Sequence, residues 1–250
     1  MVEMSVMFRW VAAAWVLTFP VHLWAKPSVV LDPGHGGDKS GTKSTAGLLE
    51  KDVCLAIAMQ AASVLRKSGV RVYLTRQTDV DLPLPARVAV ANTRGAAVYV
   101  SIHNNWAPVS DRRGVEVYVL SASASDEVAS ALLHAEEQGV GDEDTFGGGA
   151  ATDLDYILGD LDRTTAHRRS ALLARRVQDA LAQVKGLGPS RGLRQAPFLV
   201  LQGAHMPAVL VEVGYLSHAG QARYLGSRRG QRSAGRALAQ GIITFLKASS

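Results

Sequence analysis

Apolar runs that predict strands alternate with amphipathic segments that predict helices between residues 28 and 120, and this alternation restricts the fold more than any other feature. Strands are expected at 28–32, 70–75, 97–102 and 115–120, and helices at 50–68 and 85–93. In the first of these helices apolar residues recur at helical spacing, and Gly69 follows it as a C-terminal stop. A β-α-β order of this kind predicts an α/β sheet with several parallel strands.

The segment 121–169 interrupts this pattern. Eleven acidic residues and no lysine or arginine lie between Asp126 and Asp162, and three glycines occupy positions 147–149. Two helices are expected in it, at 125–138 and 153–161, so we interpret the segment as an acidic helical insertion over the sheet. Beyond it, the patterns predict helices at 170–184 and 235–246 and strands at 198–201 and 209–213.

The N-terminus has the pattern of a signal peptide. Arg9 precedes an apolar run at 10–24, which is shorter than a membrane-spanning helix, and a cleavage site is expected after Ala25. Residues 1–25 would then be removed, residues 26–250 would form the mature protein, and the protein would be periplasmic or secreted without stable membrane insertion. An uncleaved membrane anchor is the alternative. Cys54 is the only cysteine, so the chain forms no internal disulfide.

The charge distribution favours an anionic polymer as partner. The chain has a formal net charge of +5, and its arginines are concentrated after residue 163. Peptidoglycan carries carboxylates on its stem peptides and fits this charge. Nucleic acid would fit it too, but the sequence has neither a nucleic-acid-binding motif nor an aromatic stacking platform, so no nucleic-acid partner is expected.

Four residues have the placement of catalytic or metal-binding groups. His35 follows the first expected strand within Asp-Pro-Gly-His-Gly-Gly, and His103 follows a later buried strand. Ligand sites in α/β sheets gather at these strand ends. Glu50 opens the helix after the first loop, where the helix dipole alone would favour an acid. Glu212 lies within the apolar run Val-Leu-Val-Glu-Val, where burying a carboxylate is costly unless it has a partner or a function.

Two histidines and one carboxylate are a common ligand set for catalytic zinc, which keeps one coordination position open for water. A second carboxylate is then needed to take up and return a proton, and Glu212 fits that role by type and position. Residue spacing alone leaves separate structural roles for His35, Glu50 and His103 open.

The combined motifs resemble the zinc-dependent N-acetylmuramoyl-L-alanine amidase family in its AmiA/AmiB/AmiC-like periplasmic form. The resemblance runs in family order from residue 29 to about 246. The matching stretches are VVLDPGHGG (29–37), EKDV (50–53), VYLTRQTD (72–79), ARVAVAN (86–92), YVSIHNN (99–105), GVEVYVL (114–120), RQAPFLVL (194–201) and MPAVLVEVGYLS (206–217).

This resemblance implies a single α/β domain with a mixed, mostly parallel sheet flanked by helices. It implies that His35, Glu50 and His103 bind one Zn²⁺ per chain and that Glu212 is the catalytic carboxylate. The implied reaction is hydrolysis of the amide between N-acetylmuramic acid and L-alanine in peptidoglycan, in cell-wall remodelling or daughter-cell separation. Asn104 is expected either to orient substrate or to cap its loop.

Two further residues of the family pattern, Arg76 and Asp79, are expected to pair and brace a loop rather than to contact substrate.

The insertion at 121–169 resembles the regulatory segment of that family, in which a helix covers the active site until an activator protein displaces it. An acidic side chain of the helix can then occupy the open zinc position. Glu137 is the first candidate for this autoinhibitory ligand and Glu136 the second; an ordinary solvated helix is the alternative.

Two other functions remain open at this stage. Another peptidoglycan zinc hydrolase, such as a carboxypeptidase, could use a similar ligand set. A non-catalytic wall-binding or activator protein could retain the fold. The intact catalytic positions and the extended motifs favour the amidase.

Overall fold

The computed structural model describes residues 26–109, 111–137 and 153–248. The expected signal peptide at 1–25 and the glycine run at 147–149 lie outside the described residues. Within these ranges, no helix is both long and apolar enough to cross a membrane.

In the described part of the chain, six strands form one sheet in the order β2-β1-β3-β6-β4-β5. Their bounds are β1 Ser28–Pro33, β2 Arg71–Leu74, β3 Val98–Asn105, β4 Val115–Leu120, β5 Ser190–Ala196 and β6 Ala208–Tyr215. Every neighbouring pair is parallel except β4 and β6, which run antiparallel. The sheet is therefore mixed and mostly parallel, which confirms the expected fold class.

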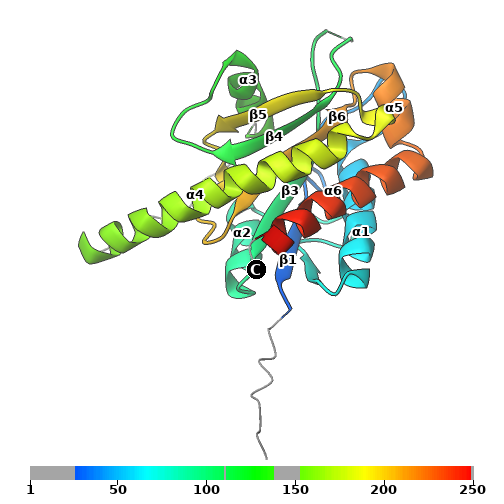
Figure 1. The fold of residues 1–250 in the computed structure, drawn as a ribbon. Helices are drawn as coiled ribbons and strands as arrows, with labels where there is room; N and C mark the ends of the chain where they lie inside the picture. Colours follow the sequence, from blue (N-terminus) through cyan, green and yellow to red (C-terminus); the bar gives the residue numbers. More distant parts are fainter. Residues whose placement is uncertain (1–25, 110, 138–152, 249–250) are drawn as a thin grey trace, which may run out of the picture.

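Helices cover both faces of the sheet (Figure 1). One face is covered by α1 Glu50–Lys67, α4 Asp153–Ala182 and α6 Arg228–Ala248, whose apolar side chains form the larger core cluster. The other face carries α2 Leu84–Thr93 and α3 Glu127–Glu136, with a second, smaller cluster. The short helix α5 Ala219–Leu225 precedes α6. Strands β1, β3 and β6 are buried along their whole length, as continuous apolar runs in a parallel sheet require.

The sequence patterns were wrong or incomplete in several places, among them the following three. The run at 198–201, expected as a strand, contains a 3₁₀ turn, Leu199–Leu201. A run of four apolar residues is too short for its periodicity to distinguish a strand from a helical turn. The backbone conformation at 198–201 is therefore set by packing against the smaller cluster. The helices expected at 153–161 and 170–184 are one continuous helix, α4. Strand β5 was not expected because it is a polar edge strand.

Candidate metal centre

His35 lies in the loop that follows β1, and its backbone has φ of 57°, a left-handed conformation that is uncommon for a residue with a side chain. Its neighbour Gly34 is required by close packing, since a Cβ there would lie 2.5 Å from the imidazole of His103. Gly41 has φ of +64°, and a Cβ there would meet both Glu50 and His35 at 2.5 Å. The loop is therefore shaped around these side chains.

Two buried arginines hold this loop in place. Arg76 donates hydrogen bonds to the carbonyl oxygens of Pro33 and Gly34, at 3.0 and 2.8 Å. Arg87 donates to the carbonyl of His35 at 2.9 Å and pairs with the buried carboxylate of Asp32 at 3.0 Å. Arg76 thus braces the loop, as expected. It does so by hydrogen bonds to backbone oxygens rather than by the expected pairing with Asp79.

Asp79 braces the same loop by separate contacts. Its carboxylate accepts hydrogen bonds from the backbone N–H of Gly37 at 2.8 Å and from the Lys51 ammonium at 2.7 Å. Lys51 also donates to the carbonyl of Gly37. Arg76 is 3% exposed, so it does not contact substrate in this conformation.

Glu50 and His103 come from elements that lie against each other. Glu50 is the first residue of α1 and is fully buried. One carboxylate oxygen accepts from the backbone N–H of Asn104 at 2.9 Å, and the other from the backbone N–H of Thr42 at 2.8 Å. His103 lies near the carboxyl end of β3 and is 6% exposed. The structure therefore brings together the three ligands that the sequence resemblance implied.

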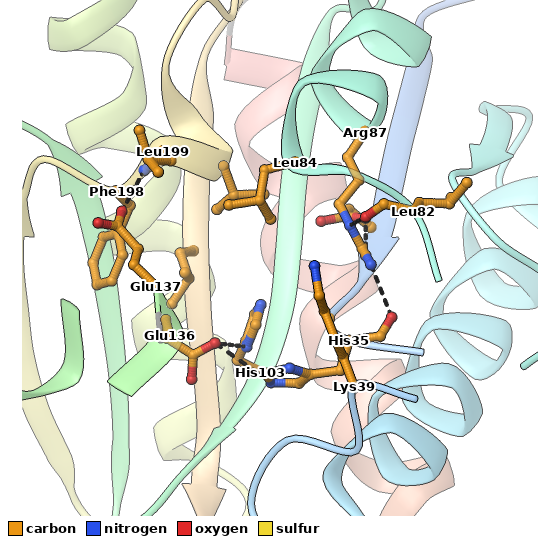
Figure 2. Close-up of a pocket in the computed structure, with 14 residues that line it drawn as sticks. His35, Lys39, Leu82, Leu84, Arg87, His103, Glu136, Glu137, Phe198 and Leu199 are labelled. Atoms are coloured by element: carbon orange, nitrogen blue, oxygen red, sulfur yellow. Dashed lines mark hydrogen bonds and ion pairs between the residues drawn. The ribbon is translucent and has the colours of Figure 1, made fainter. Parts of the chain in front are cut away.

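A fourth group, Glu136, completes a cluster with these three (Figure 2). Glu50 Oε1 lies 3.1 Å from both His35 Nε2 and His103 Nδ1. Glu136 Oε2 lies 2.8 Å from His103 Nδ1 and 3.4 Å from His35 Nε2. An ion with tetrahedral bonds of about 2.0 Å separates its ligand atoms by about 3.3 Å. His35 Nε2 is also buried without a hydrogen-bond partner, so the cluster fits a small metal ion.

Electrostatics in the cluster are dominated by its carboxylates. Burial lowers the pKa of His103, but Glu136 and Glu50 outweigh that effect and raise its pKa well above the usual value. Burial raises the pKa of Glu50, but the two histidines outweigh it and hold this pKa below its usual range. The negative charge that gathers here suits a cation.

Glu137, the first candidate for the autoinhibitory ligand, points away from the histidines in Figure 2. Its carboxylate accepts a hydrogen bond from the backbone N–H of Leu199 at 2.8 Å. Glu136, the second candidate, occupies the cluster instead. Glu136 therefore replaces Glu137 as the first candidate for the autoinhibitory ligand. Adjacent side chains at a helix end point in different directions, so only one of the two can face the cluster.

Glu212 lies on β6 directly beside the cluster. It is opposite His103 in the parallel pairing of β3 with β6 and is fully buried. Among the described residues, neither of its carboxylate oxygens has a hydrogen-bond partner. Burial raises the pKa of Glu212 well above its usual value, and the nearby Glu136 adds to this effect. A buried carboxyl group without a structural partner is the feature expected of a proton carrier.

Asn104, expected to contact substrate or cap its loop, does not face the metal cluster. Its side chain is fully buried, and its Oδ1 accepts from the thiol of Cys54 on α1 at 3.5 Å. Strand alternation places Asn104 and His103 on opposite faces of the sheet. The Asn104 side chain therefore has no exposed surface in this conformation, and a substrate contact by it stays a prediction. Burial raises the pKa of Cys54, in keeping with a core residue.

Sequence reasoning did not single out Glu116 on β4, a carboxylate that lies beside Glu212. It is fully buried and lies opposite Glu212 in the antiparallel pairing of β4 with β6. A lone acid within the apolar run 115–120 is the same signal that identified Glu212, and it could have revealed Glu116 as well.

The cavity beside the cluster is small. It measures about 40 Å³, and its lining includes Glu136, the last residue of α3, and Glu137, which follows it, together with His35, His103 and Phe198. Sites that hold drug-sized ligands are typically about 300–1,000 Å³. The cluster is therefore closed to a glycopeptide while α3 lies in this position.

Comparison with protein families and curated proteins gives a consistent result. The family model described as N-acetylmuramoyl-L-alanine amidase matches residues 29–244. The amidase AmiA of Escherichia coli K12 is 35% identical over 225 residues, which cover 88% of this chain and 76% of that protein. The amidase AmiC of Neisseria meningitidis serogroup B is 34% identical, over 90% of this chain and 54% of that protein. The chain thus spans about half the length of this Neisseria relative.

Solved structures agree. The amidase AmiC2 of Nostoc punctiforme is 32% identical and superposes with a TM-score of 0.66, over 89% of this chain and 98% of that chain. The catalytic domain of CwlV, an amidase of Paenibacillus polymyxa, is 29% identical with the same TM-score.

Proposed function

The chain belongs to the N-acetylmuramoyl-L-alanine amidase family, and from this premise we propose that it hydrolyses the amide between N-acetylmuramic acid and L-alanine in peptidoglycan. The observation that carries this proposal is the convergence of His35, Glu50 and His103 on one point beside the unpartnered carboxyl group of Glu212. A family model that spans residues 29–244 supports the same reaction.

We propose that His35, Glu50 and His103 hold one Zn²⁺ ion. Imidazole nitrogens and a carboxylate oxygen, without a thiolate, suit this ion. Zinc bound there would polarise the scissile carbonyl and lower the pKa of a water molecule. Glu50 is held by two backbone N–H groups, so its carboxylate has a fixed orientation before any ion binds.

Glu212 is the proton carrier in this proposal. Its carboxylate accepts a proton from the attacking water and then delivers that proton to the departing nitrogen of L-alanine. The carbonyl carbon gains the hydroxyl group and the C–N bond breaks, so the products are a lactyl carboxylate and an intact stem peptide. The absence of hydrogen bonds to Glu212 leaves both oxygens available for these transfers.

Incubation of the purified chain with cell-wall sacculi tests the proposal. Release of intact stem peptides that requires zinc and stops with a chelator would support it, because a carboxypeptidase would release single amino acids instead. The Glu136→Ala variant should be used beside the wild type, since α3 closes the cavity. If the Glu136→Ala variant binds zinc but releases no peptide, the proposed amidase activity is contradicted and a wall-binding role is favoured.

We further propose that this conformation is a resting state in which α3 blocks the site. Glu136 takes the position that substrate and water need, and its contacts to His103 and His35 at 2.8 and 3.4 Å support this role. The segment 121–169 would be moved by an activator protein. Displacement of α3 is plausible energetically because a ten-residue helix has little stability of its own.

Replacement of Glu136 should release this block. Glu136→Ala is expected to raise basal peptide release about tenfold or more, as a shifted two-state equilibrium allows. Glu127→Ala removes the same charge from an exposed position of α3 and is the matched control. Glu137→Ala should give a smaller rise than Glu136→Ala. Equal rates for Glu136→Ala and the wild type would contradict autoinhibition.

The remaining proposals concern processing and location. We propose that residues 1–25 are a cleaved signal peptide, that 26–250 form the catalytic domain with 121–169 as its regulatory insertion, and that the enzyme acts in the periplasm or outside the cell. N-terminal sequencing of the protein recovered from the periplasm tests this, and a start at Lys26 is expected. A membrane-bound protein whose sequence still begins at residue 1 would instead support an uncleaved membrane anchor.

A further inference from the structure

Glu116 is the centre of a polar network that the proposed reaction does not use. Its two carboxylate oxygens accept hydrogen bonds at 2.7–3.2 Å, and the donors are Tyr118, Tyr215, Asn105 and Arg191. Burying a carboxylate is costly unless it is paired and hydrogen-bonded, and Arg191 on β5 supplies the pairing charge at 2.9 Å. Glu116 is therefore fully satisfied without any further cation.

Arg194, also on β5, is a second cation near Glu116, but it donates no hydrogen bond to that carboxylate. Its Nε lies 3.7 Å from Glu116 Oε1, too far for a hydrogen bond, and this nitrogen is buried without a hydrogen-bond partner. Its outer end pairs with Asp126, whose side chain is 39% exposed while that of Arg194 is 16% exposed. Asp126 is thus the carboxylate that pairs with the Arg194 guanidinium in the present conformation.

Asp126 belongs to the helix that blocks the metal cluster. It is the N-cap of α3, and its Oδ1 accepts from the backbone N–H of Ala129 at 2.9 Å. Glu136 lies at the other end of the same helix. One helix therefore places one carboxylate in the metal cluster and a second carboxylate on Arg194.

The register of the sheet places Arg194 near the row of the reacting centre but two residues along from it, since its partner on β4 is Tyr118 and not Glu116. His103 on β3, Glu212 on β6 and Glu116 on β4 are successive register partners, and β5 is the next strand. Neighbouring strands are about 4.8 Å apart, so β5 lies about 10 Å from β6. An extended peptide covers that distance in about three residues.

We propose that Arg194 binds a free carboxylate of the stem peptide when α3 is displaced, and that Asp126 occupies this subsite in the resting state. This inference rests on the proposed amidase function, since it names the part of that substrate which the subsite recognises. The outer end of the guanidinium, which pairs with Asp126 through Nη1 in this conformation, presents two N–H donors to one carboxylate, as arginine does in bidentate pairs. Glu116 attracts the buried end of Arg194 through an ion pair at 3.7 Å and does not itself contact substrate in this proposal.

The test uses the zinc-loaded full chain with Glu136→Ala, so that α3 no longer holds the metal cluster. The probe is a synthetic stem peptide that begins with L-alanine and carries free carboxylates, together with its amidated counterpart. Calorimetry measures binding of each peptide, which the enzyme does not cleave. Arg194→Gln should weaken binding of the acidic peptide about tenfold or more, and Arg194→Lys should weaken it less.

The controls separate recognition from folding. Arg175→Gln, on the exposed face of α4, removes the same charge and should leave binding unchanged. Arg194→Gln should not alter binding of the amidated peptide. Equal losses for both peptides, or no loss for either, would overturn the inference.

A turnover assay with soluble muropeptides keeps the two proposals distinguishable. Arg194→Gln should raise KM for the acidic substrate with kcat nearly unchanged, because the contact is present in ground and transition states alike. If the Glu136→Ala protein cleaves nothing, the proposed function fails, while the binding result still decides whether Arg194 recognises a carboxylate.

Discussion

At the scale of single residues, the ion pair of Asp32 with Arg87 shows how the loop of His35 is fixed. Asp32 is fully buried and accepts hydrogen bonds from the hydroxyl groups of Thr75, Tyr99 and Ser101. Burial raises the pKa of Asp32, but Arg87 and these hydroxyl groups outweigh it and lower the pKa below its usual value. The pair therefore stabilises both the fold and the metal site.

Asp32→Asn should destabilise the protein by about 3–5 kcal/mol near neutral pH, because Arg87 would be left buried without a charge partner. The pKa of Asp32 is lower in the folded state than its value of about 3.9 in the unfolded chain. Its stabilisation is therefore complete above pH 4 and is lost as the pH falls through the folded pKa.

Denaturant unfolding at several pH values measures this effect. The difference between the wild type and Asp32→Asn should shrink below about pH 4. Asp179→Asn, at an exposed position of α4, is the control and should change stability little. A difference that stays constant down to pH 2 would contradict the assignment.

Glu212→Gln tests the proton carrier at the same scale. The amide keeps the shape of the side chain but cannot take up a proton, so peptide release should fall by about 10²–10⁴-fold. Zinc content, measured by elemental analysis, should stay near one per chain. Retention of activity in this variant would remove Glu212 from the mechanism.

At the scale of elements, α3 is the part of the described structure whose loss would change the site most. Its buried side chains are Ala129 and Leu132, and its remaining anchors are the carboxylates at its two ends. Such a helix depends on packing for its stability. Weakening that packing should therefore open the site without unfolding the sheet.

Leu132→Ala should raise basal peptide release and speed hydrogen exchange of the backbone amides in residues 127–136, because it removes the main apolar contact of α3. Leu172→Ala on α4 removes an equal side chain from a position that is 56% exposed, and it should change neither measurement. Faster exchange without increased activity would show that α3 does not control the site.

At the scale of the whole molecule, the metal cluster joins segments that are far apart in the sequence. His35 follows β1, Glu50 begins α1 and His103 lies near the end of β3, so an ion held by all three can bind only the folded chain. Binding that favours the folded state raises stability by mass action.

Zinc at about 1,000 times its Kd should stabilise the protein by about 4 kcal/mol. For a chain of this size the corresponding rise in Tm is about 8–16 °C. Thermal unfolding with zinc, with magnesium and with chelator measures it. His35→Ala should lose most of the rise, and magnesium should give little of it; an equal rise in His35→Ala would place the ion elsewhere.

The sequence by itself determined the order of the main strands and helices, and it named the four residues that meet in the metal cluster, although it placed Glu136 second to Glu137. Apolar periodicity fixed β1, α1, β3 and β6 to within a few residues. Residue types and positions suggested His35, Glu50 and His103 as ligands but left structural roles open, and the resemblance to the amidase family then implied them as a set. These signals are local and can be seen in one segment at a time.

Only the tertiary structure decided which neighbouring side chains face the site. Glu136 and Glu137 are adjacent at the end of α3, so their roles depend on how that helix is rotated against the sheet. The Asn104 side chain points away from the metal cluster because β3 extends to Asn105, beyond the strand end expected at 102. The side chains of residues 103 and 104 therefore still point to opposite faces of the sheet. The pairing of Arg194 with Asp126 joins two segments 68 residues apart, a contact that no local pattern records.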